Sequence, residues 1–209
     1  AVNLAAALAM MGYRILIIDA DPQASTSNLL QGNTDSPEVD KHIGHFMLSK
    51  ADGPDDDLKS ATVPVYEGGL LDLLPSDITL AESDAALVTA MSFHERAHRF
   101  FNRNREYLGR NYDAIIVDTA PGTTPIALAF TYAAKTAGKI LAVVEPVGDC
   151  VRALESLRSN LTEIAKNTDA VVEMEIIINK FQPGRTHVKD NMAVLYTRYG
   201  AILNETVVP

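Results

Sequence analysis

The 209-residue chain has one cysteine, no long apolar run and a deficit of positive charge. An internal disulfide needs two thiols, so a chain whose only cysteine is Cys150 cannot form one. This favours a reducing compartment, the cytoplasm. No apolar run approaches the ~20 residues that a membrane-spanning helix needs, and no signal peptide is recognisable. The formal net charge of −9 excludes a protein that is basic all over. Any contact with a polyanion must therefore come from a local basic patch.

The length and composition predict a single domain over residues 1–209. Hydrophobic residues make up 47% of the chain, and the mean hydropathy is +0.02. A compact domain of this size buries ~70% of the surface that its unfolded chain exposes. We therefore expect a soluble, globular fold with one sizeable core.

The most informative stretch runs from Tyr13 to Leu30, and its centre is the pair Asp19 and Asp21. Residues 15–18 are an unbroken apolar run, which is typical of a strand covered on both faces of a parallel sheet. Two carboxylates at the end of a buried strand are costly unless a cation lies beside them. A metal and nucleotide site supplies such a cation, whereas two loop carboxylates without a ligand are the plainer interpretation.

A second apolar run, residues 114–117, ends in Asp118 and is followed by a loop that contains Gly122. The carboxyl ends of strands in open α/β sheets are where ligands bind. Asp118 is therefore a candidate metal-holding residue; the alternative is an aspartate that caps a turn. Gly122 either gives the loop freedom to move or is an ordinary turn glycine.

The order of apolar runs and helical patterns predicts an α/β fold with a doubly wound, mainly parallel sheet and helices on both faces. We expect strands at 15–18, 70–74, 114–118, 139–145, 174–181 and 202–208. We expect helices at 2–11, 42–49, 79–90, 92–108, 124–136, 149–167 and 188–199, with a further helix start at 25–28. No internal repeat of fixed period is present.

The run Asp-Ala-Asp-Pro-Gln at 19–23, after an apolar strand and the helix-like AVNLAAALAMMG, resembles the deviant-Walker ATPases of the ParA/MinD superfamily. It is most similar to the ParA (Soj) partition branch, and the resemblance extends through Asp118 to the ending Glu-Thr-Val-Val-Pro. It implies a P-loop NTPase-like, three-layer αβα fold. The family's phosphate loop, Lys-Gly-Gly-Val-Gly-Lys-Thr, is not in this sequence, and we expect it to lie just before Ala1, in a chain truncated at both ends. One cysteine cannot ligate an iron–sulfur cluster, which excludes the related nitrogenase iron protein.

The resemblance implies ATP and Mg²⁺ as cofactors and assigns roles to the three aspartates. Asp118 matches the Walker B residue that holds magnesium, usually through its water shell. Asp21 matches the residue that positions or activates the attacking water, and Asp19 lies beside the magnesium shell. Gly122 matches a loop that moves with the γ-phosphate.

Three more residues matter by resemblance. Asn179, at a strand end, matches an asparagine that reads the adenine edge, since its amide both donates and accepts; an asparagine that caps backbone groups is the alternative. Pro209 matches the start of the adenine pocket wall. Arg185 matches a basic position used for DNA, and an isolated surface arginine is its alternative. The arginines of the 92–110 segment have two interpretations, a stripe that faces DNA or an ordinary solvated helix face: Arg96, Arg99, Arg103, Arg105 and Arg110.

The function that the resemblance implies is an ATPase that forms an ATP-dependent homodimer, binds DNA non-specifically and is stimulated by a ParB-like partner. The protein would be cytoplasmic and nucleoid-associated, with no membrane contact, and a chain without the phosphate loop is expected to fail at ATP binding. One alternative is a MinD-like, membrane-associated ATPase. Others are an ATPase that positions an organelle or a protein cluster, and an interaction module that has lost nucleotide binding.

Overall fold

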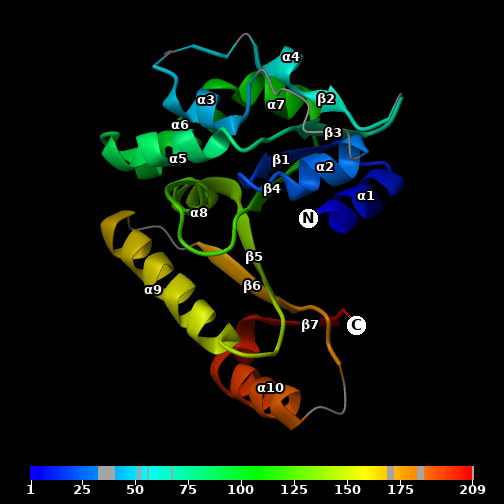
Figure 1. Ribbon diagram of the computed structural model, residues 1–209, viewed down its shortest axis with the longest axis vertical. Coiled ribbons are helices and arrows are strands. Elements are labelled where there is room, and N and C mark those ends of the chain that lie inside the picture. The colour runs from blue at the N-terminus through cyan, green and yellow to red at the C-terminus, as the bar shows by residue number, and fades with distance from the viewer. Residues whose placement is uncertain are drawn as a thin grey trace. The chain divides into compact units, whose positions relative to one another are not determined.

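The computed structural model (Figure 1) describes residues 1–32, 41–50, 53–55, 57–66, 68–168, 172–182 and 186–208. The chain divides into two compact units, Ala1–Phe130 and Thr131–Pro209. Each unit has its own sheet, and each is described by itself. The single domain over 1–209 stays a prediction.

The sheet of the first unit has the strand order β2-β3-β1-β4. Its strands are β1 (Ile15–Ala20), β2 (Val63–Pro64), β3 (Leu71–Leu74) and β4 (Ala114–Thr119). β1 pairs in parallel with β3 and with β4, whereas the short β2 is antiparallel to β3. The carboxyl ends of β3, β1 and β4 therefore meet at one edge of this sheet.

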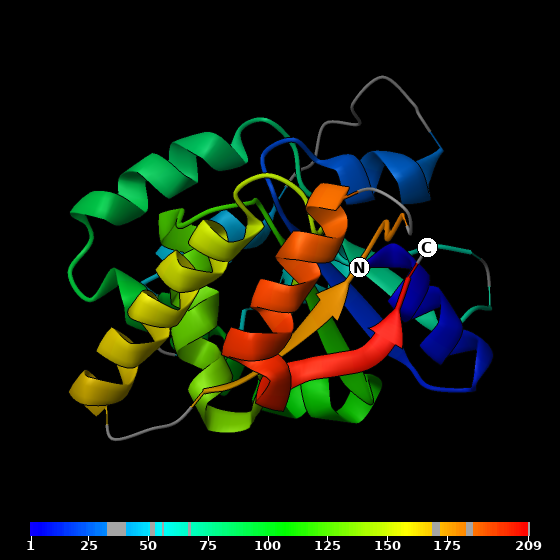
Figure 2. The same cartoon turned by 90° about the horizontal axis from the view of Figure 1, so that it is seen from below.

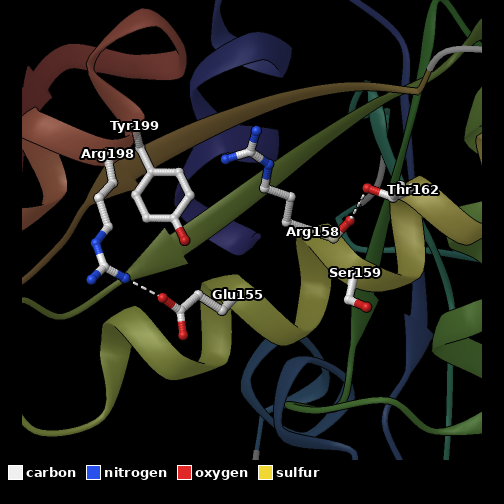
Figure 3. Close-up of a pocket in the computed structure, with 6 residues that line it drawn as sticks. All are labelled: Glu155, Arg158, Ser159, Thr162, Arg198 and Tyr199. Carbon is white, nitrogen blue, oxygen red and sulfur yellow. Dashed lines mark hydrogen bonds and ion pairs between the residues drawn. The ribbon is translucent and has the colours of Figure 1, made fainter.

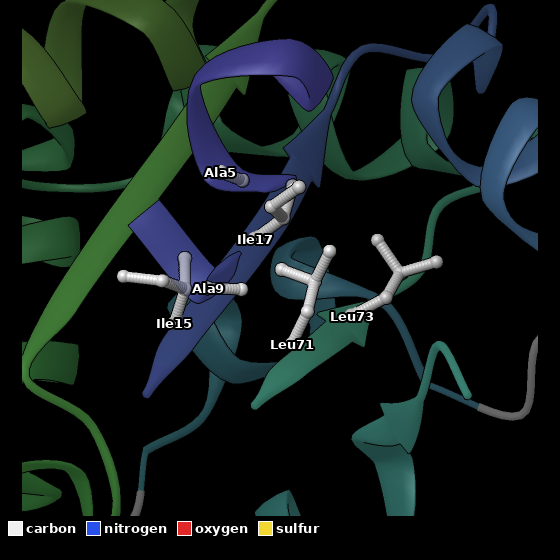
Figure 4. Packing of buried hydrophobic residues seen from close by; sticks show 6 residues of the cluster. All are labelled: Ala5, Ala9, Ile15, Ile17, Leu71 and Leu73. Atoms are coloured by element: carbon white, nitrogen blue, oxygen red, sulfur yellow. The ribbon is translucent and has the colours of Figure 1, made fainter. Parts of the chain in front are cut away.

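The core of the first unit forms around β1, because all six residues of this strand are buried. Successive side chains of a strand point to opposite faces, so Ile15 and Ile17 share one face and Leu16 and Ile18 the other. On the first face, helix α1 (Val2–Met10) packs its alanines onto the sheet, as Figure 4 shows for Ala5, Ala9, Ile15, Ile17, Leu71 and Leu73. The small alanine side chains allow this helix to approach the strands closely.

Helix α3 (Ile43–Leu48) contacts β1 and also packs against α5 (Leu80–Thr89) and α6 (Arg96–Arg103). The other helices of this unit are α2 (Ser25–Gln31), α4 (Leu58–Ala61), the 3₁₀ turn η1 (Phe93–Glu95) and α7 (Arg105–Asn111). Helix α8 (Pro125–Ala137) begins in the first unit and ends in the second.

The second unit contains a fully parallel sheet of order β5-β6-β7, built from β5 (Lys139–Val144), β6 (Glu173–Ile178) and β7 (Leu203–Val207). Its helices are α9 (Cys150–Thr168), α10 (Thr186–Tyr199) and the short η2 (Gly200–Ile202). Helices α9 and α10 lie side by side over the sheet (Figures 1 and 2). The core between them and the strands consists of Val144, Leu154, Ile176, Ile178, Leu195 and Tyr199.

The predicted helix at 92–108 is interrupted in the structure, which has η1, α6 and α7 in its place. The break between α6 and α7 falls at Asn104, whose side chain is buried and donates to the carbonyl of Phe100 at 3.0 Å and to Asp55 Oδ2 at 2.7 Å. An asparagine amide that bonds to nearby backbone competes with the helical hydrogen-bond ladder. The short elements α4 and β2 have no counterpart among the predicted elements.

Within the described ranges, no helix is both long enough and apolar enough to cross a bilayer.

Candidate functional site

The register of the first sheet places two predicted carboxylates side by side. Asp19 of β1 is the parallel-register partner of Asp118 of β4, one residue before each strand ends. Asp19 is completely buried, and Asp118 is partly buried. The structure therefore brings together Asp19 and Asp118 at the carboxyl edge of the sheet, as the sequence predicts.

The buried Asp19 carboxylate is held by hydrogen bonds from the turn that follows β1. The amide and the hydroxyl of Ser27 donate to Asp19 Oδ2 at 2.8 and 2.7 Å, and the amide of Asp21 donates to Oδ1 at 3.2 Å. Burial raises the pKa of Asp19, the Ser27 and Asp21 hydrogen bonds oppose this rise, and the charge of Asp118 adds to it. Asp19 is thus a carboxylate in an apolar setting with several fixed donors.

A hydroxyl from the same turn holds Asp118. Thr26 Oγ1 donates to Asp118 Oδ2 at 2.5 Å, and the Thr26 side chain is buried. Thr26 and Ser27 are neighbours in the first turn of α2, so one helix start contacts both carboxylates. Hydroxyl-bearing residues are favoured near helix starts, and this preference is the reason why the sequence predicts a helix start at 25–28.

Asp21 lies in the loop between β1 and α2, and its position is set locally. The amide of Gln23 donates to Asp21 Oδ1 at 2.8 Å, which closes a tight turn of the Asx type. Ala24 then adopts a left-handed conformation with φ of +50°. A non-glycine residue there costs roughly 1–2 kcal/mol, so the surrounding contacts hold this loop in a strained form.

Ser76, which lies just after β3, is the residue that connects this loop to a neighbouring strand. Its hydroxyl donates to the carbonyl of Asp21 at 3.0 Å, and its amide donates to Ser27 Oγ at 2.9 Å. Ser27 Oγ thus accepts from Ser76 and donates to Asp19. The signal for Ser76 in the sequence is its position just past a strand end, which places it at the same sheet edge as the aspartates.

Gly122 follows β4 in the loop that leads to α8, and its φ is +100°. Residues that carry a side chain rarely adopt this backbone conformation, so the turn itself requires glycine. The turn interpretation of Gly122 has direct support, and its movement with a nucleotide stays a prediction.

The remaining predicted residues lie elsewhere. Asn179 directly follows β6 in the second unit, is partly buried, and its backbone N–H donates to the carbonyl of Val144 at 2.9 Å. The structure brings Asp19, Asp21, Asp118 and Gly122 together in one unit and leaves Asn179 in the other. Arg185 and Pro209 lie outside the described residues.

The oxygen atoms at this sheet edge suit a magnesium ion that is held partly by the protein and partly by the phosphates of a bound nucleotide. In the described part of the chain, no group of three or more histidine, cysteine, aspartate or glutamate side chains could hold a metal ion. Mg²⁺ prefers oxygen ligands, keeps several waters, and is usually bound by one or two carboxylates together with substrate phosphates. Asp19 and Asp118 fit that pattern and do not fit an all-protein metal centre.

Three of the five arginines of the 92–110 segment are paired with acidic side chains. Arg99 pairs with Glu95 at 2.7 Å and Arg110 with Glu106 at 2.6 Å, each within one helical turn. Arg103 points inward and pairs with Asp55 at 2.7 Å. The solvated-face interpretation therefore accounts for Arg99 and Arg110, while Arg103 is a structural residue.

A separate open groove of about 410 Å³ lies in the second unit between α9 and α10 (Figure 3). Glu155, Arg158, Ser159, Thr162, Arg198 and Tyr199 line it. Arg198 forms an ion pair with Glu155, which neutralises part of the charge of the groove. Of the predicted site residues that the structure describes, none lines this groove.

The strands of the first sheet are mainly parallel, and aspartates lie at the carboxyl ends of two adjacent strands. This arrangement is typical of α/β proteins that bind a ligand at this edge of the sheet. The chain belongs to the AAA domain family, whose model matches residues 1–199.

Similar proteins support this assignment. The chain is 32% identical over 177 residues to the sporulation initiation inhibitor protein Soj of Bacillus subtilis, an alignment that covers 82% of this chain and 63% of Soj. It spans 44–63% of the length of the curated relatives that it matches at 32–34% identity.

Two solved structures have the same fold. Cobyrinic acid a,c-diamide synthase from Mycobacterium smegmatis with bound ATP analog and magnesium matches with a TM-score of 0.74 and 20% identity, over 95% of this chain and 75% of the other. A plasmid partition protein from Borrelia burgdorferi matches with a TM-score of 0.70 and 19% identity, over 96% and 79%. The predicted P-loop NTPase-like, doubly wound α/β fold and the resemblance to ParA-type ATPases are confirmed.

Proposed function

We propose that this chain carries the hydrolytic core of a ParA-type ATPase, a protein that binds ATP with Mg²⁺ and hydrolyses it to ADP and phosphate. The single observation that supports this most strongly is the register partnership of Asp19 and Asp118 at the carboxyl edge of a parallel sheet, with Asp21 in the loop just beyond. The match to Soj and the solved structure with an ATP analog and magnesium point to the same chemistry.

The three aspartates have distinct roles in this proposal. Asp118 holds the magnesium ion through its water shell, and Asp19, fixed by Ser27, lies beside that shell. Asp21 positions the water that attacks the γ-phosphate. Bound magnesium supplies charge neutralisation on the phosphates, which phosphoryl transfer needs more than it needs covalent chemistry.

We also propose nucleotide-binding roles for three residues beyond the aspartates. Gly122 lets the loop after β4 respond to the γ-phosphate, Asn179 reads the adenine edge and Pro209 begins the wall of the adenine pocket. The fixed hydrogen bonds around Asp19 and Asp118 mean that little reorganisation is needed when the charged ligand arrives.

We further propose that ATP drives formation of a homodimer that binds DNA non-specifically through Arg185, and that a ParB-like protein stimulates hydrolysis. The protein would then be cytoplasmic and associated with the nucleoid. This cycle requires ATP to bind the dimer more tightly than the monomer, since a ligand shifts an equilibrium only by its differential affinity.

Retention of the full-length protein on non-specific duplex DNA, measured with ATP, with ADP and without nucleotide over a salt series, tests this proposal. Retention that needs ATP and falls steeply with salt is the expected result, because phosphate contacts release counterions. Binding of ATP without retention at any salt concentration would contradict the DNA part, and a vesicle-binding assay with the same protein would then test the MinD-like alternative.

A further inference from the structure

The first turn of α2 contains a pair of neighbouring hydroxyls that contact two different carboxylates. Ser27 donates to Asp19, and Thr26 donates to Asp118, which belongs to a strand 92 residues further along the chain. The proposed roles of the aspartates do not need the Thr26 contact. Thr26 is nevertheless only 5% exposed, so its hydroxyl is fixed in a dry environment.

The contact restricts how the Asp118 carboxylate can point. At 2.5 Å, the hydrogen bond from Thr26 Oγ1 to Oδ2 is short, as expected when a hydroxyl donates to a charged carboxylate. Among the described residues, Thr26 is the side chain that donates to Asp118. One carboxylate oxygen is thereby occupied by the protein, and the other is left for a ligand.

We propose that Thr26 is a positioning residue that orients Asp118 for the hydrated magnesium ion of the bound nucleotide. This inference rests on the proposed function. The physical reason is that hydrogen bonds to a ligating carboxylate fix its rotamer before the metal arrives, and their loss costs metal affinity. Because Thr26 lies in α2 directly after the Asp21 loop, the same bond also ties that loop to β4.

The neighbouring network gives the Thr26 contact a rigid base. Ser27 is held between Asp19 and the amide of Ser76, and both serines are buried. The first turn of α2 is therefore anchored on the β1 side and the β3 side, which holds the backbone of Thr26 in place beside Asp118. Removing the hydroxyl alone should leave this anchor in place.

The test is a magnesium titration of nucleotide binding by the full-length protein, with a fluorescent ATP analogue as the probe and a chelator for the metal-free reference. Thr26→Val removes the donor and keeps the branched shape. We expect it to raise the magnesium concentration at half-saturation by about tenfold, the lower end of the loss seen when such supporting bonds are removed. Metal-free nucleotide affinity should stay close to the wild-type value.

Thr26→Ser, which retains the hydroxyl, should restore the wild-type midpoint. Thr62→Val is the matched control, because Thr62 Oγ1 donates only to the carbonyl of Leu58, at 2.8 Å. If the valine disturbs folding, Thr26→Ala removes the same donor with less bulk and carries the same prediction.

Two outcomes separate this inference from the proposed function. A wild-type protein whose nucleotide binding does not respond to magnesium would overturn both. A magnesium-dependent wild type with unchanged midpoints in Thr26→Val and Thr26→Ala would overturn the role of Thr26 alone. A loss of thermal stability with an unchanged midpoint would likewise show that Thr26 is merely structural.

Discussion

Arg103 and Asp55 form an ion pair whose side chains are only 9% and 7% exposed. Arg103 also donates to the carbonyl of Phe46, and Asn104 Nδ2 donates to the same Asp55 oxygen. Charge patterning along the chain cannot distinguish this arginine from its exposed neighbours, because its partner lies 48 residues away. Burial, not sequence spacing, gives Arg103 its structural role.

Arg103→Met is expected to lower the free energy of unfolding by about 3–5 kcal/mol, because it leaves the Asp55 carboxylate buried without its partner. Urea unfolding followed by circular dichroism measures this. Arg110→Met is the matched control, since Arg110 and Glu106 are 76% and 71% exposed. It should change stability by about 0.5 kcal/mol or less. Equal effects of the two substitutions would contradict the structural assignment of Arg103.

The aspartates of the site are recognisable from the sequence, while the hydroxyls that hold them are not. Asp19 and Asp118 each end an apolar run, and that pattern alone places them at a sheet edge. Thr26, Ser27 and Ser76 read as ordinary helix-start and turn residues. Their hydrogen bonds depend on the β1–β3 and β1–β4 register, which no local pattern specifies.

At the scale of elements, the long apolar strands and the helices around them are predictable because hydrophobic periodicity dominates there. The exceptions are elements whose bounds or existence depend on contacts with residues far away in the sequence. The helix at 92–108 breaks at Asn104, whose partner Asp55 lies 49 residues away, and β2 exists only through its pairing with β3. Helix α3 depends instead on a buried histidine at its own start.

His42 caps α3 and is almost completely buried. The amide of Gly44 donates to His42 Nδ1 at 3.1 Å, and the other ring nitrogen contacts Thr79 Oγ1 at 3.1 Å. Burial, helped by the charge of His45 and partly opposed by Asp77, lowers the pKa of His42 to about 4. The neutral ring is therefore the form that caps the helix.

We expect the protein to lose stability between pH 6.5 and 4. In this window the unfolded chain binds a proton at His42 and the folded chain does not, so stability falls as the pH falls. A shift of this size corresponds to roughly 3 kcal/mol. In His42→Asn, which can still cap a helix, urea midpoints measured over this range should depend less on pH. An undiminished pH dependence in the variant would contradict the prediction.

At the scale of the whole molecule, the net charge of −9 restricts how the protein can meet DNA. Attraction must come from a local cluster and must be sensitive to salt. Of the five arginines of α6 and α7, Arg99, Arg103 and Arg110 are each paired with an acidic side chain, which reduces the positive charge that these helices offer to DNA. Arg185, which the resemblance to partition ATPases assigns to DNA contact, is the residue to test.

Arg185→Ala should weaken DNA retention and reduce the slope of log affinity against log salt by about one, as expected for the loss of one phosphate contact. Arg110→Ala is the control, because Glu106 already neutralises Arg110, and it should leave the slope unchanged. Both variants are compared in the same ATP-dependent retention assay. A reduced slope in Arg110→Ala with a wild-type slope in Arg185→Ala would move the DNA surface to α7.

We expect Asp19, Asp21 and Asp118 to form a site for Mg²⁺-dependent ATP hydrolysis. Phosphate release and ATP binding by the full-length protein, measured side by side for the wild type and Asp21→Ala, test it most directly, with Asp149→Ala as an exposed-aspartate control. We predict that Asp21→Ala binds ATP with near wild-type affinity and loses phosphate release by about 100-fold or more, the scale expected when a water-positioning group is removed. Phosphate release by Asp21→Ala at the wild-type rate would contradict the proposed role of Asp21.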